Sequence, residues 1–341
     1  MTFKTIIQPS GHNFPIEAHE TILEAALRHG YTLPYSCRDG VCGTCKGKVV
    51  TGQVDYGKHQ ESTLSEAEKV AGMALFCCAK PLSDLVLECR EVNAVKDIPV
   101  KTMPCRVQKM ERPAPDVMVL WLKLPANERL QFLAGQYIDI LLKDGARRAY
   151  SLANAPHDDS FLQLHIRRVP GGSFSDLVFT QMHEKALLRF EGPLGTFFLR
   201  EDSDKPILLL ASGTGFAPVK AMLEHAFHHG IKRPITFYWA AHNLTHLYML
   251  DLPKKWEQEH ANFKFVPVLS EPAPEDHWQG RTGFLHQTVM EDYTDLEDYQ
   301  VYACGSPVMV EAAHQAFTTQ RKLPNEEFYS DAFTFSSKPK A

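Results

Sequence analysis

The sequence CRDGVCGTC at residues 37–45 decides how this chain folds, because three of its cysteines stand in C-x4-C-x2-C spacing. Two further cysteines, Cys77 and Cys78, follow later in the chain. Thiolates in this spacing, completed by one later cysteine, are typical ligands of a [2Fe–2S] cluster. Gly40 and Gly43 suit a loop whose backbone must approach the cluster closely and adopt positive φ angles. The pattern therefore predicts a cluster whose first three ligands are Cys37, Cys42 and Cys45.

Other interpretations of these cysteines are weaker. A structural zinc site would more typically pair two C-x2-C knuckles, and this chain has a single one. A disulfide framework is typical of a short secreted domain, which a chain of 341 residues is not. Unrelated buried cysteines would not be expected to keep this spacing. The residues alone leave open whether Cys77 or Cys78 supplies the fourth ligand.

Length and composition bound the class of protein. The chain has 341 residues, of which 44% are hydrophobic and 23% charged, so it is globular and long enough for two or three domains. Its net charge is -5 and it has no lysine or arginine run, so we expect neither nucleic acid nor an anionic membrane as partner. The start lacks the apolar core of a signal peptide, and no stretch reaches the length of a membrane span. We therefore expect a cytoplasmic protein whose eight cysteines are ligands and free thiols.

Hydrophobic periodicity divides the chain into three regions of different fold class. Residues 1–93 predict a small α+β domain, and residues 94–103, with mixed charges, are typical of a linker. Residues 104–202 contain short strands separated by Gly and Pro, which predicts a closed antiparallel barrel. Residues 203–333 alternate strands with helices, which predicts a parallel α/β sheet. We expect residues 334–341 to form a flexible tail.

The first region carries the most detailed local signals. Thr21, with Glu24 three residues later, predicts a capped helix start, and Gly30 predicts its end. A short polar helix is expected at residues 64–68. Strands are expected at residues 5–7, 14–16, 47–50 and 85–87.

Two segments of the barrel region offer groups that can bind a phosphorylated ligand. Residues 147–152, RRAYSL, present a cation, an aromatic ring and a hydroxyl at the end of a strand. Residues 165–167 and 172–175 place a basic strand before a Gly-Ser turn, and a turn that leads into a helix can hold phosphate oxygens. On chemistry alone, an ordinary exposed strand explains residues 147–152 equally well.

A glycine turn follows the first strand of the α/β region. The sequence ASGTGFAP at residues 211–218 lies between an apolar strand and a helical stretch, the position of a dinucleotide-binding turn. Pro218 stands where the full fingerprint has a third glycine. A 2′-phosphate usually requires a nearby arginine, and none occurs between Arg233 and Arg281. We therefore expect NADH rather than NADPH as the substrate.

Together these motifs resemble those of the ferredoxin–NADP reductase superfamily. Residues 1–93 resemble the β-grasp domain of plant-type ferredoxins, and FCCA at residues 76–79 then aligns Cys77 as the fourth ligand. Arg-x-Tyr-Ser at 148–151, Gly-Thr-Gly-x-x-Pro at 213–218 and Cys-Gly at 304–305 match that superfamily's flavin and nicotinamide signatures. The resemblance implies a β-grasp [2Fe–2S] domain, an antiparallel Greek-key FAD-binding β-barrel and a Rossmann-like, parallel-sheet NAD(P)-binding domain.

The resemblance also implies roles for individual residues. Arg148 would lie at the FAD pyrophosphate, Tyr150 against the isoalloxazine and Ser151 near its N5 atom. Ser151 and Cys304 would frame the hydride transfer as the catalytic residues. The other implied FAD contacts are His165, Arg167, Gly172, Ser173, Ser175 and Phe333. The implied NAD contacts are Gly213, Thr214, Gly215, Pro218, Cys304 and Gly305, and the implied iron ligands are Cys37, Cys42, Cys45 and Cys77.

Within the superfamily, the chain resembles the CDP-6-deoxy-Δ3,4-glucoseen reductase family. The runs that carry this likeness are residues 133–139, 147–156, 192–198 and 330–333. The likeness implies an NAD(P)H-dependent iron–sulfur flavoprotein reductase that passes electrons from NADH through FAD and the cluster to a partner protein. The implied partner is a sugar dehydratase. The alternatives are a reductase component of an aromatic-ring or soluble oxygenase, an NAD(P)H:flavin or quinone reductase, and a redox-sensing module.

Overall fold

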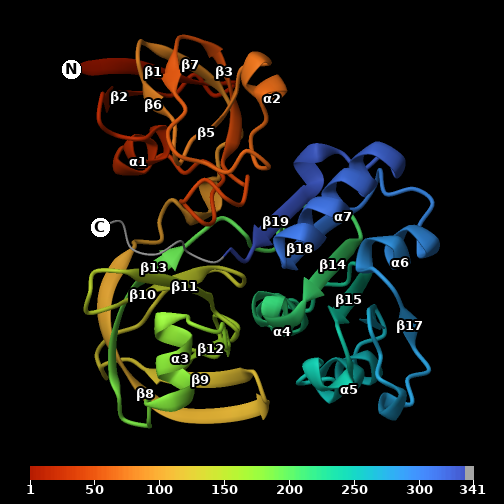
Figure 1. Ribbon diagram of the computed structural model, residues 1–341. Coiled ribbons are helices and arrows are strands. Elements are labelled where there is room, and N and C mark those ends of the chain that lie inside the picture. The colour runs from red at the N-terminus through yellow and green to blue at the C-terminus, as the bar shows by residue number, and fades with distance from the viewer. Residues whose placement is uncertain (335–341) are drawn as a thin grey trace. The chain divides into compact units, whose positions relative to one another are not determined.

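The computed structural model describes residues 1–334 and separates into two compact units, Met1–Pro99 and Val100–Phe333 (Figure 1). Apart from Thr334, the tail expected at residues 334–341 lies outside the described residues. Among residues 1–334, no helix combines the length and the apolar character that crossing a membrane requires.

The first unit is built on a five-stranded mixed sheet with the order β2-β1-β7-β3-β5. β1 pairs with β7 in parallel, and its pairing with β2 is antiparallel, as are the pairings of β3 with β5 and β7. Helix α1 (Ile22–Arg28) buries Ile22, Leu23 and Ala26 in the core of this unit. The strands of the sheet are β1 (Thr2–Gln8), β2 (Asn13–Glu17), β3 (Lys46–Thr51), β5 (Met73–Leu75) and β7 (Leu85–Glu88).

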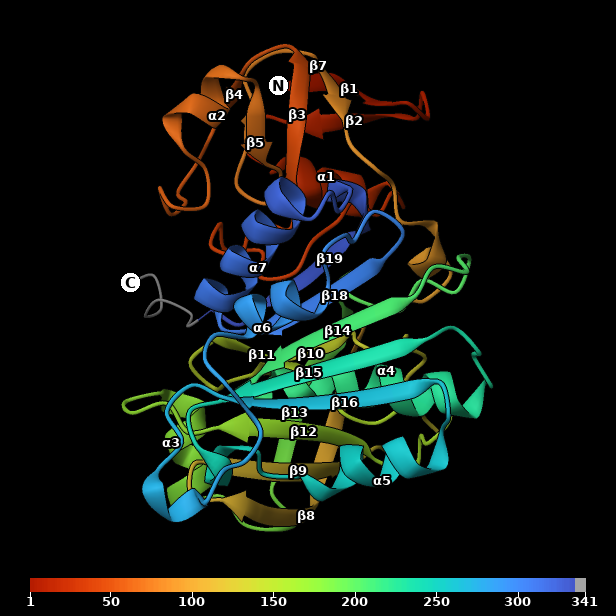
Figure 2. The ribbon, with the colours of Figure 1, turned by 90° about the vertical axis from the view of Figure 1, so that its right-hand side faces the viewer.

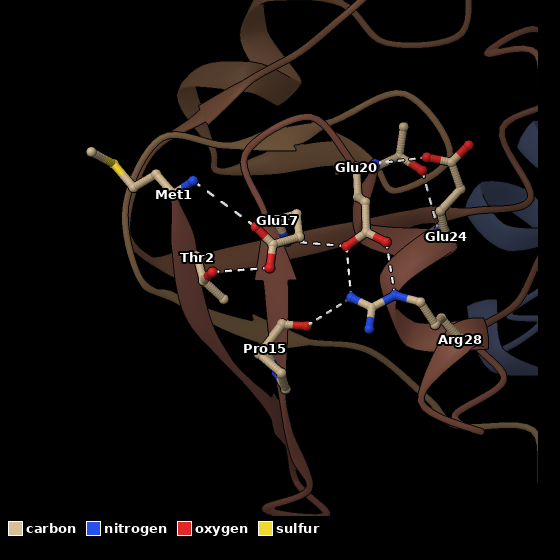
Figure 3. Close-up of polar contacts among 8 residues, drawn as sticks. Met1, Thr2, Pro15, Glu17, Glu20, Glu24 and Arg28 are labelled. Carbon is tan, nitrogen blue, oxygen red and sulfur yellow. Dashed lines mark hydrogen bonds and ion pairs between the residues drawn. The ribbon is translucent and has the colours of Figure 1, made fainter.

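Side-chain hydrogen bonds fix the start and direction of α1 (Figure 3). The Thr21 hydroxyl accepts the N–H of Glu24 at 3.2 Å, and the Glu24 carboxylate accepts the N–H of Thr21 at 2.9 Å. This is the predicted capping box, which satisfies two N–H groups at the helix start. From the last turn, Arg28 donates to Glu20 at 2.7 Å and to the carbonyl of Pro15 at 3.4 Å. These bonds tie α1 to β2 and to the turn that follows it.

The remaining elements of the first unit are short. A second helix, α2 (Glu66–Val70), begins two positions after the predicted start at residue 64, because Ser65 is its N-cap and forms a capping box with Glu68. β4 (Val54–Asp55) and β6 (Lys80–Pro81) form a two-stranded sheet. Within the stretch expected as a linker, a 3₁₀ turn η1 (Asn93–Val95) comes first, and residues 101–103 already belong to the first strand of the second unit.

The second unit begins with a six-stranded antiparallel sheet that curls into a barrel (Figure 1). Its strand order is β11-β10-β13-β8-β9-β12, and a bridge between Leu152 and Leu164 joins the two edges. Helix α3 (Ser173–Thr180) buries Phe174 and Val178 in the barrel core. The strands are β8 (Lys101–Ala114), β9 (Val117–Lys123), β10 (Tyr137–Leu141), β11 (Arg147–Ser151), β12 (Leu162–Arg167) and β13 (Leu187–Leu194).

A six-stranded parallel sheet completes the second unit, with the order β17-β16-β15-β14-β18-β19. Helices α4 (Phe216–His228) and α5 (Asp251–Glu259) cover one face, and α6 (Leu285–Asp292) and α7 (Pro307–Gln320) cover the other (Figure 2). The strands are β14 (Ile207–Ser212), β15 (Ile235–Ala241), β16 (Phe263–Leu269), β17 (Arg281–Thr282), β18 (Gln300–Gly305) and β19 (Phe328–Ala332).

Two features of this sheet position a ligand site. From β14 the chain adds β15, β16 and β17 on one side and then β18 and β19 on the other, so the strand order reverses between β14 and β18. Open α/β sheets bind ligands at such a switch point, outside the carboxyl ends of their strands. The apolar core of the parallel sheet also includes Val117, Phe197 and Leu199 of the barrel region, packed with Phe216 and Trp239. Barrel and parallel sheet therefore share one core, so side chains from both can meet at the switch point.

Candidate functional site

The cysteine loop of the first unit presents its thiols as two pairs. Cys37 is hydrogen-bonded to Cys42, and Cys45 is hydrogen-bonded to Cys77. A [2Fe–2S] cluster has two irons that share four cysteine ligands, so two adjacent thiol pairs suit it. Cys45 and Cys77 are 4% and 8% exposed, and they belong to the apolar core of the unit.

Backbone amides point at these sulfur atoms. The N–H of Asp39 donates to the Cys37 sulfur at 3.4 Å, and the N–H of Gly40 donates to Cys77. Gly40 has a φ of 73°, and a Cβ atom there would lie 2.7 Å from the sulfur of Cys78 and 2.9 Å from a backbone oxygen. A side chain at this position would therefore be strained and would collide with its neighbours. The thiol pairs and the amides that face them fit a cluster with negatively charged sulfurs.

Within each pair, one thiol donates a hydrogen bond and the other accepts it. The bond from Cys45 lowers the pKa of Cys77, and the bond from Cys37 lowers the pKa of Cys42. The same bonds raise the pKa values of the donors, Cys37 and Cys45. Each pair thus favours one thiolate, the form in which cysteine binds metal.

Two of the predicted FAD contacts meet where β11 approaches the start of α3. The guanidinium of Arg148 donates to the hydroxyl of Ser173 at 3.1 Å. Gly172 is the N-cap of α3 and makes no side-chain cap, which leaves N–H groups of the first turn available to an anion. The hydroxyl of Ser175 bonds to both the N–H and the carbonyl of Val169, at 3.1 and 3.2 Å. Ser175 therefore shapes the turn.

Tyr150 is a β11 residue beside the start of α3. Its ring packs against Phe174 with centroids 5.5 Å apart, and burial raises the pKa of its hydroxyl. The phenol therefore stays neutral at physiological pH.

Two further predicted FAD contacts, His165 and Arg167, connect the barrel with the parallel-sheet region. The Nδ1 atom of His165 lies 2.8 Å from the hydroxyl of Tyr248, and burial lowers the pKa of His165 well below its ordinary value. Arg167 is paired with Asp116 at 2.8 Å. Its guanidinium lies 2.8 Å from the position that a Cβ atom on Gly213 would take. Arg167 thus faces the glycine turn.

The glycine turn connects β14 to α4. Gly213, Thr214 and Gly215 form the 3₁₀ turn η2 (Gly213–Gly215), and Pro218 is buried in the first turn of α4. A Cβ atom on Gly215 would lie 2.4 Å from the carbonyl oxygen of Cys304. The turn can therefore approach the end of β18 only because this residue is glycine, which places Gly213–Gly215 beside Cys304 and Gly305 at the switch point.

The carboxylate of Asp331, which is not among the site residues predicted from the sequence, lies at the switch point. The hydroxyl of Ser151 donates to Asp331 at 3.4 Å, and Asp331 is the cross-strand partner of Cys304. Burial, followed by the charge of Asp331, raises the pKa of the Cys304 thiol. The N–H of Phe333 donates to the carbonyl of Gly305 at 2.7 Å, and its ring packs on the shared core. The sequence signal that could have identified Asp331 is its position as the single charged residue in the aromatic strand FYSDAF.

Comparison with known proteins assigns the three regions. Residues 5–82 match the 2Fe-2S iron-sulfur cluster binding domain, residues 104–199 the oxidoreductase FAD-binding domain, and residues 209–315 the oxidoreductase NAD-binding domain. The chain is 41% identical over 336 residues to CDP-6-deoxy-L-threo-D-glycero-4-hexulose-3-dehydrase reductase of Yersinia pseudotuberculosis serotype I, covering 98% of this chain and 99% of that protein. It is 34% identical over 342 residues to the phenol 2-monooxygenase reductase component DmpP of Pseudomonas sp., covering 97% and 96%.

A solved structure has the same fold over nearly the whole chain. The cytochrome P450 reductase GcoB of Amycolatopsis superimposes with a TM-score of 0.78 and 35% identity, over 98% of this chain and 100% of that one. Fold and domains together define the class, an NAD(P)H-dependent oxidoreductase with a [2Fe–2S] domain, an FAD-binding domain and an NAD-binding domain. The chain belongs to the iron–sulfur flavoprotein reductase family of the ferredoxin reductase superfamily. The predictions of fold class, family and cofactor classes are thereby confirmed.

Proposed function

We propose that this protein oxidises NADH and delivers the electrons singly to a CDP-sugar dehydrase. The observation that carries this proposal is the 41% identity, over 98% of the chain, to a reductase named for CDP-6-deoxy-L-threo-D-glycero-4-hexulose-3-dehydrase. The alternative client, an oxygenase component, is favoured by the 34% identity to the phenol 2-monooxygenase reductase. For the location of this reaction we propose the cytoplasm.

In this proposal, different residues described above bind FAD, bind NADH and surround the site of hydride transfer. When bound, FAD accepts a hydride and the iron–sulfur cluster carries single electrons. We propose that Arg148, Ser173 and the first turn of α3 bind the FAD pyrophosphate, with Tyr150 against the flavin ring; the bond between Arg148 and Ser173 supports this. We propose that the turn Gly213–Gly215 binds the NADH pyrophosphate. The resemblance implies Arg167 as an FAD contact, but its guanidinium faces Gly213, and we propose that it binds the NADH pyrophosphate instead. Ser151 and Cys304 flank the point where the two ligands meet, and Phe333 covers it.

Iron is bound, in this proposal, by Cys37, Cys42, Cys45 and Cys77. The pairing of Cys45 with Cys77 and the amide of Gly40 that faces Cys77 support Cys77 over Cys78 as fourth ligand. As domain boundaries we propose residues 1–93, 104–202 and 203–333. The three matched ranges lie inside these boundaries and support them.

We propose a preference for NADH, and the charges around β15 and β16 support it. Arg233 donates to Gln300 and to two backbone carbonyls, and Arg281 is paired with Asp292 and Glu291. The carboxylate of Asp276 accepts the N–H of Leu244, three residues beyond β15. In this proposal, a 2′-phosphate bound after β15 would be repelled by the Asp276 carboxylate, and Arg281 is already engaged, whereas a 2′-hydroxyl carries no charge to repel. We therefore expect a kcat/KM for NADH above that for NADPH.

Reconstitution with purified partners tests the proposal. The protein and NADH are mixed with either the CDP-sugar dehydrase or an oxygenase component, and product formation by each partner is measured. We expect turnover of the sugar dehydrase; turnover of the oxygenase alone would assign the reductase to the alternative client. In the Cys42→Ser variant, partner turnover should collapse while NADH oxidation with ferricyanide continues. Partner turnover that survives in Cys42→Ser would show that the cluster is not on the electron path.

A further inference from the structure

We propose that Cys78, which is not an iron ligand in the assignment above, donates an S–H···S hydrogen bond to the ligand sulfur of Cys77 and makes the cluster easier to reduce. The inference rests on the proposed function through its assignment of Cys77 as the fourth ligand. It makes Cys78 a positioning residue for the electron-transfer step.

The geometry of the two thiols carries this inference. The sulfur atoms of Cys77 and Cys78 are 3.5 Å apart, within hydrogen-bond distance for sulfur. In the protein without iron, either thiol can be the donor. A sulfur bound to iron is a thiolate and has no proton to donate. Once Cys77 is a ligand, only Cys78 can donate, so the direction of the bond is settled by the chemistry of the cluster.

The surrounding backbone holds the Cys78 thiol at this place. The N–H of Cys78 donates to the carbonyl of Leu75 at 2.9 Å, which fixes its main chain. A Cβ atom on Gly40 would lie 2.7 Å from the Cys78 sulfur, and one on Gly57 would lie 2.5 Å from the Cys78 carbonyl oxygen. Both positions are glycine, so the cluster loop and residue 57 close around Cys78. The space beside Cys77 is thus shaped for a thiol.

The electrostatic consequence has a definite sign. Reduction adds one electron to the cluster and transfers no atom, so negative charge on the ligand sulfurs increases. A hydrogen bond to a ligand sulfur stabilises the more negative, reduced form more than the oxidised form, and such bonds are among the factors that set cluster potentials. Loss of the Cys78 donor should therefore shift the midpoint potential of the cluster to a more negative value.

The test compares the holoprotein with its Cys78→Ala and Cys78→Ser variants. EPR-monitored redox titration gives the midpoint potential of the cluster, and iron and acid-labile sulfide are measured per chain. We expect Cys78→Ala to keep wild-type iron and sulfide but to show a more negative midpoint potential. Cys78→Ser keeps a donor and should restore the potential toward the wild-type value. Cys89→Ala removes another thiol of the same unit and serves as the matched control, with an unchanged potential.

Two results would overturn the inference. A Cys78→Ala cluster with the wild-type potential would show that the thiol donates no effective hydrogen bond. Loss of iron from Cys78→Ala, together with a wild-type cluster in Cys77→Ala, would make Cys78 the ligand. The proposed function is judged separately, from NADH oxidation and partner turnover by the wild-type protein. A reductase without the proposed partner could still show the shift in potential, so the two failures are distinguishable.

Discussion

The hydroxyl of Ser151 donates a 3.4 Å hydrogen bond to the carboxylate of Asp331, which lies 180 residues later in the chain. Ser151 ends a barrel strand and Asp331 belongs to the last strand of the parallel sheet, and the two residues are 6% and 5% exposed. Asp331 also pairs in register with Cys304. The bond thus joins the proposed FAD-binding and NAD-binding halves of the second unit where the hydride would cross.

The first prediction concerns this bond. Replacement Asp331→Ala removes the acceptor that orients the Ser151 hydroxyl, and misplacement of groups around a reacting centre can slow a step about 100-fold. We expect flavin reduction by NADH, followed by stopped-flow absorbance, to slow by about 10- to 100-fold. Asp331→Asn keeps an acceptor and should slow it less. The control is Asp159→Ala, which breaks an exposed ion pair with Arg129. A wild-type rate of flavin reduction in Asp331→Ala would show that Asp331 does not assist hydride transfer.

A second prediction separates the roles of two arginines. Arg148 bonds to Ser173 at the start of α3, whereas Arg167 faces Gly213 in the turn after β14. A hydrogen bond to a charged group contributes about 1.5–3 kcal/mol, which corresponds to roughly 10- to 100-fold in affinity. We expect Arg148→Ala to lose FAD on purification and Arg167→Ala to keep FAD but raise KM for NADH about 10-fold. Loss of FAD from Arg167→Ala at unchanged KM would reverse the assignment.

The third prediction is a pH dependence that arises from His165. Burial holds the pKa of His165 well below its ordinary value in the folded protein. Above pH ~6.5 the ring is neutral in both the folded and the unfolded chain. As the pH falls below that value, the unfolded chain binds a proton that the folded protein does not, so stability is lost at about 1.4 kcal/mol per pH unit.

Urea unfolding between pH 7.5 and 5.5 measures this effect. His165→Gln retains a group that can bond to Tyr248 but removes the titration, so its free energy of unfolding should decline less steeply. Equal slopes in wild type and His165→Gln would contradict the prediction.

The fourth prediction concerns the capping box of α1. Thr21→Ala removes the side-chain acceptor for the N–H of Glu24, and loss of an N-cap costs about 1 kcal/mol. We expect a decrease of that size in the free energy of unfolding of the first unit, measured by circular dichroism in urea. Thr2→Ala removes an exposed hydrogen bond to Glu17 and is the control, with an expected change within about 0.5 kcal/mol. Equal losses in the two variants would show that the cap has no special role.

Several parts of the molecule were predictable because their signals are local. The capping box of Thr21 and Glu24 links residues three positions apart, and the structure confirms it. The Gly-x-Gly turn follows an apolar strand directly, and it lies between β14 and α4 as expected. Ser65 with Glu68 is a similar local signal, and it starts α2 at Glu66, two residues after the predicted start. Residues 101–103, at the end of the expected linker, alternate as the start of β8.

By itself the sequence determined the cysteine spacing, the order of the three regions and the turns that begin their helices. Each of these depends on residues close together in the chain, whose relative positions the backbone restricts. The contacts of Ser151 with Asp331, of His165 with Tyr248 and of Arg167 with Gly213 exist only in the folded chain. Burial of the apolar core shared by the barrel and the parallel sheet brings these distant groups together, and no local spacing encodes that packing.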